Sequence, residues 1–443
     1  MKQGGLERFM TMHDDRSTKI AHVFLIKGNS RDLLEKLPRA FMNVVNRHPK
    51  MRTTSISGSF ELKALPKLDL TKAQKLVTVV KDDWRELIRT ECDVAFNRLD
   101  EIPYKINIIV ENESESRLIL WSDHYMADGH SGLIIMNDLL TNIRDECIEM
   151  PELPIKRSIF DHVVKKNWFV YNINKLLCTI LEKPVLAEMK GYKNNLKISS
   201  KLPSDPLKEY GTTYSHFGEG KPENLQKSIA KCREEKTTLN AAAMVLVCAT
   251  IAKTVGKQDK IKLQMDIDYN MRNKVKGLDE KDVGFNITIG SLESLKKGLD
   301  LNQNFWKAAK KLKKESLTAN TSFLAKTIQT FVHLKFNKLS NITIPHDHGC
   351  INDVNLSNIG RYPFERKVGD YYLDSFHVFN TIPGLGPSVI LYLCTTDRIA
   401  YSMASKVEES QAKIVFDTFV LLLERIHEIE SHFTIAQVIQ LIN

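Results

Sequence analysis

Apolar and polar positions follow two different periods along this chain, and both periods occur in its first half. Apolar residues from Thr18 to Lys27 predict a strand, whereas those from Leu33 to Val45 recur at the spacing of one helical face. Two further apolar runs, Tyr104 to Val110 and Arg117 to Ser122, flank an acidic, polar turn and predict a hairpin. A helical pattern resumes after Gly129.

The second half shows the same mixture of periods. Strands are predicted at Thr212 to Phe217 and at Ile261 to Ile267, and a strongly apolar, buried helix at Ala241 to Val255. A second hairpin joins Ser388–Cys394 to Arg398–Ala404. Strands and helices mixed in both halves predict an α/β (α+β) fold. A chain of 443 residues is long enough for two lobes.

The stretch from Lys190 to Tyr210 differs in character from its surroundings. It is rich in Lys, Asn, Ser and Pro, which is typical of a linker. We therefore expect an N-terminal lobe over residues 1–190, a linker over 191–210 and a C-terminal lobe over 211–443.

Composition is that of a packed globular protein, with 42% hydrophobic and 26% charged residues. Seven scattered cysteines without a Cys-x-x-Cys pair, and an N-terminus without an apolar segment, favour a reduced, cytoplasmic protein. The net charge of +9 suits a phosphate-bearing partner. No nucleotide-binding fingerprint and no basic-aromatic interleaving is present, so we do not expect a nucleic-acid partner.

Two stretches allow more than one interpretation. The helical pattern from Ile159 to Leu181 carries many aromatic and aliphatic residues beside lysines, so it fits either core packing or a peripheral membrane contact. We expect core packing. Pro345 to Cys350 holds two His, one Asp and one Cys, but adjacent ligands in one short loop lack the paired spacing of a zinc site. We expect a polar loop and no metal.

The strongest chemical signal lies where the first predicted hairpin ends. His124 follows the apolar run, and Asp128 and Gly129 come four and five residues later, in a His-x-x-x-Asp-Gly pattern. Catalytic groups are commonly presented on loops at the ends of rigid elements. An imidazole titrates near neutral pH and so suits a general base.

Other stretches accompany this motif in a fixed order. They are Arg47-His48-Pro49-Lys50-Met51-Arg52-Thr53, Thr237-Thr238-Leu239-Asn240-Ala241, Asp268-Tyr269-Asn270-Met271-Arg272, Val283-Gly284-Phe285-Asn286 and Asn355-Leu356-Ser357-Asn358-Ile359-Gly360. The ordered set resembles the superfamily of condensation domains, alcohol acetyltransferases and polyketide-associated acyltransferases. The resemblance implies two chloramphenicol-acetyltransferase-like lobes in a V, with the active-site tunnel between them.

The resemblance also implies roles for individual residues. His124 would be the general base, and Asp128 of the same catalytic motif would pair with Arg272 as a structural brace. We expect Gly129 to permit a tight backbone turn. The stretch holding Asn355, Ser357 and Asn358 would lie across the tunnel and supply an oxyanion or substrate contact, by a group that the sequence leaves open.

Asp123 departs from the pattern of peptide-forming condensation domains, which usually begin the motif with two histidines. It would either orient the imidazole or face solvent.

The activity implied is an acyl transfer from a thioester to an alcohol or amine. The donor would be acyl-coenzyme A or an acyl carrier protein, either of which brings a phosphopantetheine thioester, and the acceptor a small molecule. No permanently bound cofactor is expected. Two alternatives remain open: a wax-ester or diacylglycerol-type synthase, and a non-catalytic, condensation-like binding protein.

Overall fold

The computed structural model describes residues 2–442 except 12–17, 57–58, 97–100, 166, 191, 193, 197–212, 257–258, 322, 344–349 and 383–385. Its helices are α1 (Leu6–Met10), α2 (Ser30–Arg47), α3 (Leu70–Leu76), α4 (Trp84–Glu91), α5 (Gly129–Arg144), α6 (Trp168–Lys190), α7 (Pro222–Glu234), α8 (Leu239–Val255), α9 (Glu293–Lys297), α10 (Phe305–Thr321), α11 (Phe323–Thr343), α12 (Glu409–Glu424) and α13 (Ile435–Gln440). Short 3-10 turns are η1 (Pro49–Arg52) and η4 (Ile426–Glu428), and η2 (Asp161–Lys165) is a π-helical turn.

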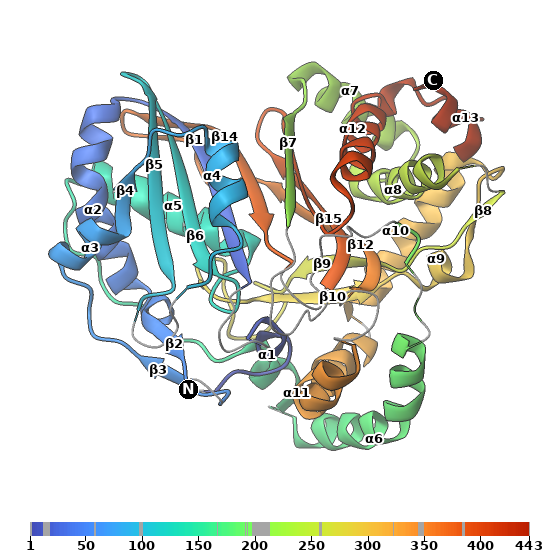
Figure 1. Cartoon of the computed structure of the whole chain (residues 1–443), viewed down its shortest axis with the longest axis horizontal. Helices are drawn as coiled ribbons and strands as arrows, with labels where there is room; N and C mark the ends of the chain where they lie inside the picture. Colours follow the sequence, from blue (N-terminus) through green and yellow to red (C-terminus); the bar gives the residue numbers. More distant parts are fainter. Residues whose placement is uncertain are drawn as a thin grey trace.

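The strands are β1 (Lys19–Lys27), β2 (Thr53–Ser55), β3 (Leu62–Ala64), β4 (Val77–Val79), β5 (Tyr104–Asn112), β6 (Glu115–Asp123), β7 (Tyr214–Glu219), β8 (Lys260–Ile261), β9 (Met265–Asn270), β10 (Ile287–Ser291), β11 (Leu299–Asp300), β12 (Cys350–Arg361), β13 (Lys367–Val368), β14 (Tyr371–Asn380), β15 (Gly386–Thr395) and β16 (Ile399–Ser405). Within the described residues they form two six-stranded sheets, ordered β13-β14-β1-β6-β5-β4 and β10-β9-β12-β15-β16-β7, and two short ribbons. Figure 1 shows the two sheets side by side, each with its own helices.

The first sheet is built around the hairpin of β5 and β6. Apolar side chains of β1, β5 and β6 are buried against α2 and α5, which form the first core. An ion pair and a hydrogen bond also join the two helices, because Arg47 Nε and His48 Nε2 each lie 2.9 Å from Asp138 Oδ2. The predicted hairpin is therefore present, and it ends at Asp123, directly before His124.

Two strands of the first sheet, β13 and β14, come from the second half of the chain. β14 pairs antiparallel with β1, from Ile20 opposite Asn380 to Lys27 opposite Tyr372. The expected C-terminal lobe, 211–443, thus contributes β13 and β14 to the N-terminal sheet. Most of the expected linker, 191–210, lies outside the described residues.

The second sheet has β12 near its centre, parallel to both β9 and β15. Helices α8, α10 and α12 cover it and form the second core. As expected, α8 is buried along most of its length, from Ala241 to Ala252. The parallel pairing brings β9, which leads to Arg272, beside β12, which carries Asn355.

Three further expectations concern the aromatic helix, the loop from Pro345 to Cys350 and the cysteines. The aromatic helix forms η2 and α6, but four of its large apolar side chains are exposed, so the expectation of core packing is wrong for them: Trp168, Phe169, Leu176 and Ile180. The loop at 345–349 lies outside the described residues. All seven cysteines are free and buried.

Candidate active site

His124 occupies the first position after β6, in the loop that leads to α5. Its backbone N–H donates to Thr18 O at 2.7 Å, and its ring Nδ1 lies 2.7 Å from Ala127 O. Because a carbonyl oxygen only accepts, Nδ1 carries the proton and Nε2 of the neutral ring keeps its lone pair. Burial lowers the pKa of His124 below 6.5, so the ring is neutral at pH 7.

A cavity opens beside this ring between the two sheets. From the first half it is lined by His124 itself, Ile20, Gly129 and His130, and from the second half by Asp268, Asn270, Ile287, Ser357, Asn358, Ile359 and Tyr392. The phenyl ring of Phe285 meets the imidazole edge-on, with 5.4 Å between centroids. His124 therefore faces the β12 stretch that was expected across from it.

Asp128 and Arg272 form a two-pronged ion pair between the halves of the chain. Arg272 Nη1 donates to Asp128 Oδ2 at 2.9 Å, and Nη2 donates to Oδ1 at 3.0 Å. Both side chains are almost fully buried, at 0% and 1% exposure. Burial alone would raise the pKa of Asp128, but the Arg272 charge and its hydrogen bonds bring it down to about 2.

The Asp128 carboxylate also accepts two hydrogen bonds from the backbone. As the N-cap of α5 it accepts from the backbone N–H of Ser131 at 2.8 Å, which satisfies one of the free donors at the start of the helix. It also accepts from the backbone N–H of Asn286 at 2.8 Å, while Ser131 Oγ lies 2.8 Å from Gly284 O. Asp128 thus connects three stretches of the chain: the loop that carries His124, the turn that carries Arg272, and the Val283–Asn286 loop.

The three β12 candidates differ in how their side chains are engaged. Asn358 Nδ2 donates to Asn240 Oδ1 at 3.2 Å, and its Oδ1 accepts from Gly360 N–H at 3.0 Å. Asn355 Nδ2 donates to Asp268 Oδ1 at 3.2 Å, and Asn355 is not among the residues that line the cavity. Ser357 lines the cavity and carries a hydroxyl group, which hydrogen-bonds to Asp268.

Gly129 makes a close contact instead of the tight turn that was expected. Its φ angle is not positive, so no special turn is made there. Instead, a Cβ at this position would lie 2.4 Å from Ile359 Cδ1. Three residues on, a Cβ at Gly132 would lie 2.1 Å from the ring of His22. The start of α5 therefore packs closely against Ile359 of β12 and His22 of β1.

Asp123 does not face solvent, since it is fully buried, so that alternative is wrong. It stands across the sheet from Lys19 of β1. The Nδ1 atom of His124 already has the Ala127 carbonyl as its partner. The orienting contact on the imidazole therefore comes from the backbone of its own loop.

Two residues of the site, the half-buried Asp268 and the buried His22, were not predicted. Asp268 lines the cavity, and burial raises its pKa to about 6, against the opposing hydrogen bonds from Asn355 and Ser357. His22 Nε2 donates to Gly129 O at 3.0 Å, and this bond connects β1 to the start of α5, directly after the loop that carries His124. Asp268 had a sequence signal, because Asp266 and Asp268 alternate on a strand that also holds apolar Ile267. His22 had none beyond lying in an apolar strand.

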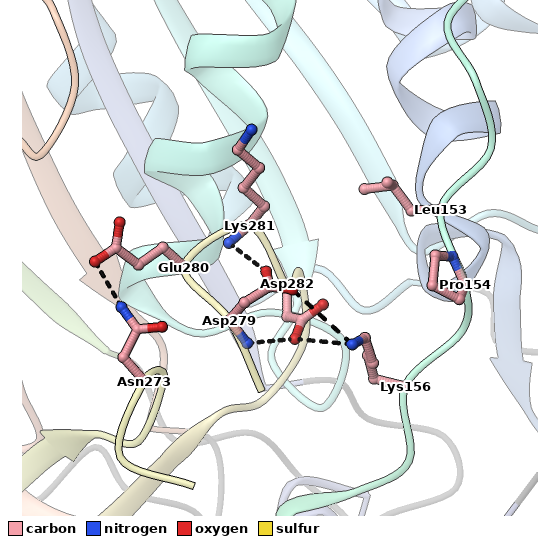
Figure 2. A pocket seen from close by; sticks show the side chains of 8 residues that line it. All are labelled: Leu153, Pro154, Lys156, Asn273, Asp279, Glu280, Lys281 and Asp282. Carbon is pink, nitrogen blue, oxygen red and sulfur yellow. Dashed lines mark hydrogen bonds and ion pairs between the residues drawn. The ribbon is translucent and has the colours of Figure 1, made fainter. Parts of the chain in front are cut away.

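A larger hollow lies at the surface between residues 153–156 and the loop after Arg272 (Figure 2). Its charged side chains interact with one another: Lys156 Nζ lies 3.8 Å from Asp282 Oδ2, and Asn273 Nδ2 donates to Glu280 Oε1 at 2.6 Å. The backbone carbonyl of Asp282 accepts from Arg272 Nε at 2.8 Å. This hollow is the outer side of the Arg272 loop, and the candidate chemistry belongs to the cavity at His124.

No protein-family model and no curated protein matches the sequence, but solved structures match the fold. A trichothecene 15-O-acetyltransferase from Fusarium sporotrichioides superimposes with a TM-score of 0.74 at 11% identity, over 96% of this chain and 95% of that one. A cyclization-docking bidomain from Sorangium cellulosum gives 0.66 at 15% identity, over 98% and 86%. Polyketide synthase associated protein 5 from Mycobacterium tuberculosis gives 0.62 at 12%, over 96% and 97%. The predicted resemblance is confirmed for the fold: this chain has the two-lobed α/β fold of the condensation-domain and acetyltransferase superfamily.

Proposed function

We propose that this chain is an acyltransferase that moves an acyl group from a thioester to a hydroxyl or amine, with His124 as the general base. The observation that carries the proposal is the state of the His124 ring. It is neutral, its Nδ1 is held by Ala127 O at 2.7 Å, and it lines a cavity that also contains Ser357. A fixed, unprotonated Nε2 is what general-base catalysis requires.

The reaction follows from that arrangement. Nε2 takes the proton of the acceptor hydroxyl as its oxygen attacks the thioester carbonyl. The resulting tetrahedral oxyanion accepts a hydrogen bond, which we assign to the Ser357 hydroxyl or to the backbone beside Asn358, because both residues line the cavity. The C–S bond then breaks, and the thiolate takes the proton from Nε2. An ester and a free thiol leave, and the imidazole is neutral again.

Asp128 and Arg272 are positioning residues in this scheme. Their charges are directed at each other and at the backbone of Ser131 and Asn286, so they hold the two halves of the cavity in register. The donor would be acyl-coenzyme A or a carrier-bound phosphopantetheine thioester. A neighbour described as a trichothecene 15-O-acetyltransferase favours an oxygen acceptor over nitrogen.

The proposal is tested by following free thiol release from acetyl- and long-chain acyl-coenzyme A with a panel of acceptors. The panel contains small alcohols, long-chain alcohols, diacylglycerol and amines. Acetylation of small acceptors would indicate an acetyltransferase, and turnover of long-chain alcohols or diacylglycerol would indicate a wax-ester or diacylglycerol synthase. We expect His124→Ala to lower the rate at least about 100-fold. His432→Ala, at an exposed position, is the matched control. Thiol release by His124→Ala at the parent's rate would refute the assignment of the base, and no turnover of any donor would favour the binding-protein alternative.

A further inference from the structure

Helix α6 carries two chemically different faces. Figure 1 shows α6 and α11 together at one end of the molecule, with α6 at the outer edge. Asn174, Cys178 and Glu182 recur every four residues and face α11. Thr327 Oγ1 donates to Asn174 Oδ1 at 2.7 Å, and Lys335 Nζ lies 2.6 Å from Glu182 Oε2. This face accounts for how α6 is attached to the rest of the protein.

The outward face is apolar. Trp168, Phe169, Leu176 and Ile180 are each between 62% and 76% exposed. At 100° per residue these four fall within an arc of about 120°, turned away from Asn174 and Cys178. Isolated exposed apolar residues are ordinary, but four large ones on one side of one helix mark an interaction site.

Lysines surround this row. Lys175 and Lys183 are exposed and project from the same side of the helix, whereas Lys165, which precedes it, is paired with Asp161. The carboxylates of α6 are neutralised by ion pairs, Glu182 with Lys335 and Lys338 and Glu188 with Lys296. The charge left around the apolar row is therefore positive.

We propose that α6 is an interfacial helix that rests its apolar row on an anionic lipid surface. A row of tryptophan, phenylalanine, leucine and isoleucine bordered by lysines is the pattern of helices that lie in the plane of a membrane. A second copy of the chain fits less well, because a two-fold contact would bring the same lysines against each other. In the described part of the chain no single helix is long and apolar enough to cross a bilayer; α7 and α8 reach that composition only together, across a 100° bend.

The tryptophan distribution makes a direct test possible. Of the four tryptophans, Trp84, Trp121 and Trp306 are buried, and Trp168 is exposed. A change in intrinsic fluorescence on adding vesicles therefore reports on α6. We expect a blue shift of the emission with vesicles of phosphatidylcholine and phosphatidylserine, and a much smaller one with phosphatidylcholine alone. Trp168→Phe should abolish the shift.

Vesicle flotation measures the binding itself. We expect Trp168→Ser/Phe169→Ser and Lys175→Glu/Lys183→Glu each to weaken the partition coefficient on anionic vesicles about tenfold or more. The matched control is Ile414→Ser/Leu421→Ser, which removes two exposed apolar residues from α12 and should bind as the parent does. All these positions are exposed, so circular dichroism should show the folded chain in each case.

Two results would overturn the proposal. One is that the parent fails to float with anionic vesicles or floats equally with the Trp168→Ser/Phe169→Ser variant. The other is a dimer in sedimentation analysis that this variant converts to a monomer, which would assign the face to a second copy. Acyl transfer to soluble acceptors plays no part in either measurement.

Discussion

Asp128 and Arg272 lie 144 positions apart in the chain, yet their side chains form two parallel hydrogen bonds of 2.9 and 3.0 Å in the closed space between the sheets. A planar guanidinium matches a carboxylate in this way, and a lysine ammonium does not. The pair fixes the start of α5, and with it the position of His124, relative to the second sheet.

Removing one partner of this pair leaves a buried, unpaired charge. We expect Arg272→Ala to lower the free energy of unfolding by about 3–5 kcal/mol. Arg272→Lys should recover only part of it. Arg89→Ala, which breaks an exposed pair with Glu86, should change it by less than about 1 kcal/mol. Urea unfolding measures all three, and equal effects at Arg272 and Arg89 would contradict the brace.

The same pair predicts a dependence on acid. The pKa of Asp128 is about 2 in the folded chain, against an ordinary 3.8. A lowered carboxyl pKa contributes stability above 3.8 that is lost as the pH falls through about 2, and the difference corresponds to roughly 2 kcal/mol. Asp128→Asn should therefore show a smaller loss of stability over this range than the parent does. Parallel curves for the two proteins would argue against it.

Two glycines at the start of α5 should respond differently to alanine. At Gly132 the new methyl group would meet the His22 ring at 2.1 Å, and a buried ring in a strand has little room to move. We expect Gly132→Ala to cost about 1–3 kcal/mol. At Gly129 the methyl would meet the flexible end of Ile359, so the cost should be smaller. Gly218→Ala, with contacts of 3.5 Å or more, is the control. Thermal denaturation ranks the three variants, and a larger effect at Gly129 would contradict this order.

Activity should persist at mildly acidic pH. His124 works as a base only when it is unprotonated, and burial lowers its pKa below 6.5. The acid limb of kcat/KM should therefore have its midpoint below pH 6.5, with activity lost as the pH falls through that point. A rate profile with acetyl-coenzyme A and the best acceptor measures it. A midpoint above 6.5 would show that another group controls the rate.

Asp268 should make the protein more stable when it is protonated. Its pKa is raised to about 6, so the folded chain loses stability as the pH rises from 3.8 through 6, by roughly 3 kcal/mol at most. Asp268→Asn keeps an acceptor for Asn355 without the charge. We expect its melting temperature to exceed the parent's at pH 7.5, with a gain that shrinks towards pH 4. Asp370→Asn, at an exposed turn, should show no such trend. A gain at Asp268 that does not vary with pH would exclude titration as its cause.

The sequence by itself determined the elements and the reacting stretch. Apolar runs place strands near β1, β5, β6, β15 and β16, since burial on one face of a sheet or helix leaves its period in the chain. The hydrophobic pattern on either side of the His-x-x-x-Asp-Gly motif puts His124 at the end of a strand and shortly before a helix, because such patterns depend on neighbouring residues.

Tertiary structure decided what those residues touch. Three features depend on contacts between residues far apart in the chain: β14 crosses to the first sheet, Gly129 lies against Ile359, and Asp123 is buried. The exposure of Trp168 was decided in the same way. A helical row of apolar residues has the same period whether a core covers it or not, so only the packing of α6 against α11 shows which of its faces is left open.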